Sequence, residues 1–254
     1  MSPERSVEGS SSRHDEVASA SITALTFQAV VDDCRRVLTT RGRRSLLAFT
    51  MLVGALAAVL VMTATPVDER TVAAVSGPVQ LLMSITVPFF GVMLVQDLAR
   101  PSQRPALVSS ILAALVVAAM VAVVGITLCG LATAVTDSRA PDGRWQHVGT
   151  VALGSVLVQL LAQLQGTGLG MLVRRRTLAC LLTIVLPLGL WLALGALDVL
   201  RPAQAWLTPF SAASNLLAGQ MSAVRWAQWL VVAAVWGVGL NVLGVLRAAD
   251  GQRP

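Results

Sequence analysis

The chain has 254 residues, of which 55% are hydrophobic and only 13% are charged. A soluble domain carries about a quarter charged residues, and one globular core of this size could not hide so much apolar surface from water. The composition therefore excludes an ordinary soluble enzyme and a disordered protein, and it predicts an integral membrane protein.

All 19 basic residues are arginine, and the formal net charge is +6 at pH 7. In membrane proteins, basic residues gather beside the spans on the cytoplasmic side. These arginines interrupt apolar runs instead of forming a stripe on a soluble face, so we expect no nucleic-acid partner. The three cysteines lie far apart and form no cluster with histidine, which leaves a disulfide framework and a zinc site unsupported.

The first part of the chain is polar, and an amphipathic segment follows it. Residues 1–21 are Ser-rich and lack the apolar core of a signal peptide, so we expect a disordered cytoplasmic tail. Residues 22–44 mix apolar and charged side chains at roughly helical spacing and end on RGRR. This pattern predicts an amphipathic helix lying in the membrane interface. An ordinary solvated helix before the first span is an open alternative.

Six apolar runs follow, each long enough to cross the hydrocarbon core, which takes about 20 residues. They cover residues 45–64, 79–95, 106–135, 148–173, 177–197 and 226–246. The expected fold is all-α and polytopic, with a six-helix transmembrane domain over residues 45–247 and a second cytoplasmic tail at 248–254.

Residues 198–225 separate the fifth and sixth runs. This segment holds apolar pieces too short to span, broken by Pro202, Pro209 and Gly219. It predicts short half-helices that dip into the outer leaflet, and a plain outer loop packed on the bundle is the alternative.

The distribution of arginine predicts the orientation. With the N-terminus inside, twelve arginines flank the spans on the inner side and five on the outer side. We therefore expect a multi-pass protein of the cytoplasmic membrane of a bacterium, with both termini cytoplasmic.

The middle of every span lacks Asp, Glu, Lys, Arg and His. Ion-coupled transporters carry such residues as relays, and membrane proteases need nucleophile, carboxylate or metal sites at membrane depth. The nucleotide-binding P-loop motif requires a lysine, which this chain lacks. We therefore expect no enzymatic activity and no cofactor in the chain itself.

Uncharged polar residues remain in the apolar runs. Gln159 and Gln163 are four residues apart and share one helix face, with Gln165 nearby. A buried amide needs a partner in lipid, so this face points into the protein, as contacts between helices or as contacts to a substrate. Asn215 and Asn241 have the same two candidate roles. Gly166 and Gly170 form a G-x-x-x-G spacing that permits close helix approach.

The order of these features resembles the permease subunit of ABC-2 type exporters, in actinobacterial members especially. The resemblance covers roughly residues 25–247 and is carried by GTGLGMLVRRR, LPLGLWLALGALDVL and LTPFSAASNLLAG. It implies a subunit that pairs with a second permease copy or a paralogue and with two P-loop ATPase subunits, which bind ATP and magnesium. It also implies export of a hydrophobic or amphipathic cargo, such as a drug, peptide or lipid-like metabolite.

Arginines on the inner side are candidates for contacts with the ATPase or with lipid headgroups. They are Arg35, Arg36, Arg41, Arg43, Arg44, Arg100, Arg104, Arg174, Arg175 and Arg176. The family joins its second and third spans by a cytoplasmic coupling helix, whereas here the link over residues 96–105 is short and holds two prolines. A non-transport membrane scaffold or assembly factor is the alternative function.

Overall fold

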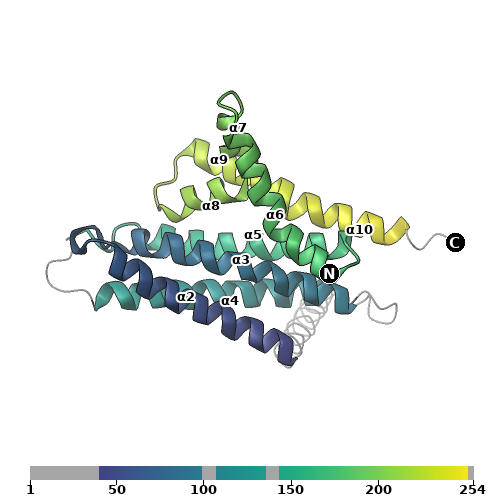
Figure 1. Cartoon of the computed structure of the whole chain (residues 1–254), viewed down its shortest axis with the longest axis horizontal. Helices are drawn as coiled ribbons and strands as arrows, with labels where there is room; N and C mark the ends of the chain where they lie inside the picture. The colour runs from purple at the N-terminus through teal and green to yellow at the C-terminus, as the bar shows by residue number, and fades with distance from the viewer. Residues whose placement is uncertain (1–39, 99–106, 136–142, 251–254) are drawn as a thin grey trace, which may run out of the picture.

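The computed structural model describes residues 40–98, 107–135 and 143–250, and these ranges contain helices and turns but no strand (Figure 1). Six helical stretches are long and apolar enough to cross a membrane. They are α2 (Arg41–Ala64), α3 (Val72–Leu98), α4 (Leu107–Ala134), α5 (Val148–Leu172), α6 (Arg176–Gly195) and a last stretch made of α9 (Ala223–Val232), η3 (Ala233–Gly239) and α10 (Leu240–Asp250). The chain is an all-α polytopic membrane protein, as the composition predicts.

All six predicted spans are present, but two of them begin four or more residues earlier than expected. The arginine cluster is the first turn of α2, because arginine is a good helix former and no breaker separates it from the apolar run. The predicted boundary at residue 45 therefore moves to Arg41. The rest of the predicted interfacial helix, with Arg35 and Arg36, lies outside the described residues.

The second span begins at Val72 instead of residue 79, and Pro78 lies inside the helix. The side chain of Val72 is fully buried, and its N–H donates to the carbonyl O of Arg144 (3.0 Å). These contacts offset the single backbone hydrogen bond that a proline removes from the ladder.

The helices α3 and α5 form the centre of the bundle. They pack along each other, with α2 and α4 against α3, and α4 and α10 against α5. In Figure 1, α2, α3, α4 and α5 run in a common direction, whereas α6 leaves them at an angle towards α7. As a result α6 is the least buried of the six spans.

Glycines allow α3 and α5 to touch through their backbones. A Cβ on Gly166 would lie 2.1 Å from the carbonyl O of Pro88, and one on Gly170 would lie 2.9 Å from Cα of Val92. Gly168 faces the other way, and a Cβ there would lie 2.6 Å from Cβ of Leu240 on α10. The close approach that the G-x-x-x-G spacing predicts is therefore present, and α5 makes it on two faces.

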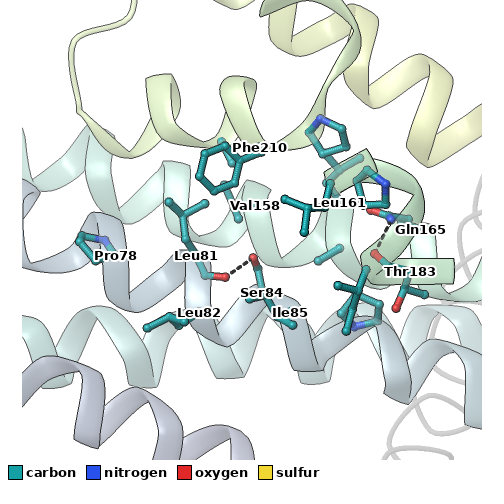
Figure 2. Close-up of a pocket in the computed structure, with 17 residues that line it drawn as sticks. Pro78, Leu81, Leu82, Ser84, Ile85, Val158, Leu161, Gln165, Thr183 and Phe210 are labelled. Carbon is teal, nitrogen blue, oxygen red and sulfur yellow. Dashed lines mark hydrogen bonds between the residues drawn. The ribbon is translucent and has the colours of Figure 1, made fainter. Parts of the chain in front are cut away.

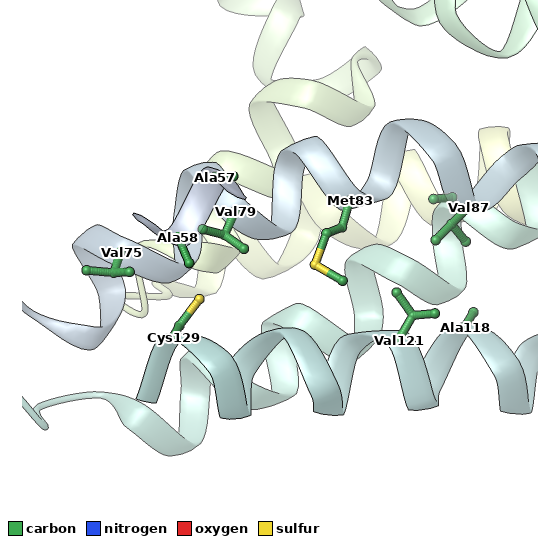
Figure 3. Close-up of a cluster of buried hydrophobic side chains, with 10 residues drawn as sticks. Ala57, Ala58, Val75, Val79, Met83, Val87, Ala118, Val121 and Cys129 are labelled. Atoms are coloured by element: carbon green, nitrogen blue, oxygen red, sulfur yellow. The ribbon is translucent and has the colours of Figure 1, made fainter. Parts of the chain in front are cut away.

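An apolar cluster joins α2, α3 and α4 around the buried Met83 (Figure 3). Small residues on the two outer helices make room for this side chain: a Cβ on Gly54 of α2 would lie 2.6 Å from its Sδ, and one on Gly125 of α4 would lie 3.0 Å from it. The cluster therefore depends on one flexible thioether packed between small residues.

The segment between the fifth and sixth spans forms two short helices, α7 (Arg201–Leu207) and α8 (Pro209–Leu217). Proline stands in the first turn of each, and the extended residue Thr208 separates them. Neither helix is long enough to cross a membrane. The helix α8 packs on α5 and buries Leu216 and Leu217 there. The predicted short helices are therefore present, and their dip into the outer leaflet stays a prediction.

The sixth span contains a π-helical turn, η3, between α9 and α10. Within it, Trp236 is buried and donates from Nε1 to the carbonyl O of Leu207 at the end of α7 (2.8 Å). The apolar periodicity of the sequence does not predict this widening, because a single π turn leaves the composition of the run unchanged.

Candidate functional site

A pair of glutamines links the three central spans. Gln159 on α5 is fully buried, and its Nε2 donates to both Oε1 (2.9 Å) and the backbone O (3.0 Å) of Gln80 on α3. Gln80 in turn donates from Nε2 to the carbonyl O of Ala122 on α4 (3.1 Å). Gln159 Oε1 accepts no hydrogen bond from the described residues. This pair is a contact between helices.

Gln163 lies one turn further along α5 and contacts α3 beside its central proline. The donors and acceptors around the Gln163 amide fix which of its atoms is nitrogen and which is oxygen. In that orientation the amide nitrogen donates to the carbonyl O of Val87 (3.0 Å), and the amide oxygen accepts from the N–H of Gly91 (3.1 Å). In a regular helix these two backbone groups pair with each other. The Gln163 amide therefore bridges the hydrogen-bond ladder of α3 just after Pro88.

Two more contacts fasten the outer helices to α5. Gln165 donates from Nε2 to the carbonyl O of Thr183 on α6 (3.1 Å). On α10, Asn241 accepts from Thr167 Oγ1 (2.8 Å) and donates from Nδ2 to the carbonyl O of Leu164 (2.8 Å) and of Gly237 (2.6 Å). Asn241 thus satisfies the carbonyl of the π-helical Gly237 and joins this part of the sixth span to α5.

Asn215, the remaining amide candidate, differs from the others. It is half-buried on α8, and its side chain makes no hydrogen bond within the described part of the chain. Of the five amides that the sequence singles out, Gln159, Gln163 and Asn241 thus act between helices. Only Gln165 also faces a cavity.

We expect Asn241→Leu to lower the free energy of unfolding by about 1–2 kcal/mol, because it removes three hydrogen bonds between α10 and its surroundings. The matched control is Asn215→Leu, which removes the same group from a position without hydrogen bonds. Titration of the purified protein with SDS, followed by tryptophan fluorescence, measures both. Equal effects of the two substitutions would contradict the role assigned to Asn241.

A cavity of about 380 Å³ lies between α3, α5, α6 and α8 (Figure 2). Most of its wall is aliphatic or aromatic, with prolines from three of these helices, and its polar residues are Ser84, Gln165 and Thr183. Phe210 at the start of α8 lies among residues from the middle of α3 and α6. Its lining residues come from α6, which runs at an angle to α3 and α5 (Figure 1), and from α8, which packs on α5.

At the N-terminal end of α6, the carboxylate of Asp97 connects three spans. Asp97 on α3 accepts from Arg43 of α2 (2.5 Å) through Oδ2 and from Arg176 of α6 (2.6 Å) through Oδ1. Next to it, Gln96 donates from Nε2 to the carbonyl O of Val173 at the end of α5 (2.9 Å). We call Arg43, Asp97 and Arg176 the arginine clamp, and the end of the bundle that carries it the basic end.

The candidate arginines fall into three groups: those in the arginine clamp, those exposed beside it, and those outside the described residues. Arg43 is buried and bound to Asp97, so it makes a contact between helices, and its candidate role in ATPase docking stays a prediction. Arg176 is also paired with Asp97, although half of its side chain is exposed. Arg41, Arg44, Arg174 and Arg175 are exposed at the basic end. Arg35, Arg36, Arg100 and Arg104 lie outside the described residues, as does most of the short link over residues 96–105.

Sequence reasoning missed Gln80, Asp97 and Thr183 as contact residues. Gln80 could have been found by the argument used for Gln159, since it is also an amide inside an apolar run. The contact of Thr183 is made by its backbone carbonyl, and no pattern of side chains could reveal it.

No protein-family profile matches the chain, and no curated protein matches it. Among the described residues, no group of three or more His, Cys, Asp or Glu side chains could hold a metal ion. The class that the structure defines is a six-span helical membrane protein with a buried amide network, an apolar cavity and an arginine clamp.

Proposed function

We propose that the chain is the membrane-spanning permease subunit of an ATP-driven ABC exporter of the ABC-2 type. The observation that carries the proposal is the pair of short helices between the fifth and sixth spans. In the family that the sequence resembles, a broken outer segment occupies this place. Here α7 and α8 fold against α5 and α6 without crossing the membrane.

The polar groups inside the bundle support a transporter that is driven by separate ATPase subunits. In the described spans, charged residues lie only at helix ends, and apart from Arg43 in the first turn of α2 the buried polar groups are amides and hydroxyls. Such an interior offers no relay for protons or sodium. The chain also lacks lysine altogether, so the P-loop that binds ATP and magnesium has to come from separate subunits.

The orientation belongs to the proposal as well. The basic end faces the cytoplasm, both termini are cytoplasmic, and the membrane is the inner membrane of a bacterium, because arginine concentrates on that side of the spans. Two such chains, or this chain and a paralogue, combine with two ATPase subunits. Hydrophobic or amphipathic molecules are the exported cargo.

In this arrangement the turn between α5 and α6 meets the ATPase. Arg174 and Arg175 are exposed there and make no ion pair with the described residues. Their guanidinium groups can form bidentate pairs with carboxylates of a partner. Arg176, the next residue, belongs to the arginine clamp, which connects this turn to α2 and α3. A displacement of the turn would therefore move α2, α3 and α6 together.

The test is charge reversal at this turn. We expect Arg174→Glu/Arg175→Glu to reduce co-purification of the proposed P-loop ATPase subunit at least ten-fold, since like charges then meet at the contact. The control is Arg201→Glu at the opposite end of the bundle, where the arginine is 65% exposed and pairs with the exposed Asp198. Undiminished co-purification by the double variant would exclude this turn as a main docking contact.

A further inference from the structure

We propose that the cavity between α3, α5, α6 and α8 is a binding site, within a single chain, for an uncharged amphiphile that has an apolar body and one hydrogen-bond donor. The site does not depend on the export function. It would exist in a scaffold as well as in a permease.

The size and position of the cavity fit a molecule that arrives from the bilayer. Its volume of about 380 Å³ lies within the range of pockets that enclose small ligands. Leu82, Ile85, Leu188 and Phe210 line it and are still 42–46% exposed, so the cavity opens on the apolar surface of the spans. Ile85 and Leu188 belong to the middle of α3 and α6, which places this opening at the depth of the acyl chains.

The polar groups of the wall offer acceptors. The hydroxyl hydrogens of Ser84 and Thr183 are both donated to carbonyls of their own helices, at 2.7 Å in each case. Gln165 is 4% exposed, and its Nε2 is held by the carbonyl of Thr183 (Figure 2). Its Oε1 accepts no hydrogen bond from any described residue.

A hydrogen-bond acceptor in an apolar cavity favours ligands that carry a hydrogen-bond donor. An amide oxygen that faces an apolar cavity without a partner is costly, and a ligand hydroxyl or amide N–H would satisfy it. Among the described residues, no charged side chain lines the cavity, so neither a carboxylate nor an ammonium group would be compensated there. Gln165 is therefore the residue that gives the site its preference for a neutral donor.

Photolabelling with a pair of probes tests the site. The probes are decanol and decane, each with a diazirine near the end of its chain, used on the purified chain in nanodiscs, with peptides mapped by mass spectrometry. We expect the alcohol to label peptides of the cavity wall about three- to ten-fold more than the alkane, which corresponds to one net hydrogen bond. Equal labelling of these peptides by the two probes would overturn the proposal.

Three variants separate binding from folding. In Gln165→Leu the preference for the alcohol should disappear while the alkane still labels the wall. Ala213→Leu places extra carbons in the cavity and should reduce labelling by both probes. Leu192→Phe, on the exposed face of α6 away from the cavity, should leave labelling unchanged. A preference for the alcohol that survives Gln165→Leu would contradict the role of Gln165.

Two sources could supply such a molecule, a membrane lipid or an exported cargo, and lipid analysis of the purified chain distinguishes them. A hydroxyl-bearing lipid that co-purifies with the wild type and is lost in Ala213→Leu identifies a lipid as the occupant. Selective photolabelling without such a lipid identifies a transient occupant, as expected for a cargo. Absence of both the lipid and the selective labelling would overturn the proposal.

Discussion

Gly166→Ala is expected to lower the free energy of unfolding by about 3 kcal/mol or more, at the upper end of the effects of overpacking. The added Cβ would lie 2.1 Å from the carbonyl O and 2.6 Å from Cα of Pro88. Both are backbone atoms, so no rotamer change relieves the overlap, and α3 and α5 have to move apart. Because Gln163 and Gly170 contact α3 on either side of this point, the separation also weakens their contacts.

The measurement is SDS-induced unfolding of the purified protein, with Gly149→Ala in the same helix as control. A Cβ at Gly149 meets nothing within 4 Å. That substitution should leave stability unchanged or raise it by up to about 1 kcal/mol, because alanine is the better helix former. If the two variants were equally stable, α3 and α5 would not be in backbone contact at Gly166.

Asp97→Asn is expected to lower the free energy of unfolding by about 2 kcal/mol, because it removes the partner of a buried cation. The side chain of Arg43 is only 10% exposed and loses its carboxylate. Arg176→Gln should have a smaller effect, below about 1 kcal/mol, since that arginine is 52% exposed and water replaces much of the interaction. Asp97→Glu keeps the charge and should restore part of the loss.

The matched control for the clamp is Asp198→Asn. Asp198 also pairs with an arginine, Arg201 (3.0 Å), but its side chain is 89% exposed and the two residues are neighbours on one turn. We expect no measurable change there. Equal effects of Asp97→Asn and Asp198→Asn in the SDS titration would show that the clamp contributes no more than a surface pair.

The spans could be predicted from the sequence because each one is a local signal. A run of about 20 apolar residues marks a span whatever its neighbours are, and the spacing of Gln159 and Gln163 places both on one helix face by geometry alone. The glycines at 166 and 170 are likewise read directly from one helix. The ends of the spans were less certain, since α3 starts before Gly77 and Pro78 through a tertiary contact with Arg144.

The cavity and the clamp could not be predicted in the same way. Asp97 pairs with arginines that are 54 and 79 residues away in the sequence, and any acidic residue at the end of a span could have found another partner. The cavity depends on the angle of α6 and on where α8 turns back, neither of which follows from hydrophobic periodicity. The sequence therefore does not distinguish Gln165 from Gln159 and Gln163, although of these three glutamines only Gln165 lines the cavity.

Native mass spectrometry of the tagged chain, purified from the cells in which it naturally occurs, tests most directly whether the chain is a permease driven by a separate ATPase. We expect a complex of two permease chains, identical or paralogous, with two P-loop ATPase subunits. We also expect ATP hydrolysis by the complex and none by the chain alone. A chain that purifies without any ATPase, or only with proteins that do not bind nucleotide, would contradict the claim and favour a membrane scaffold.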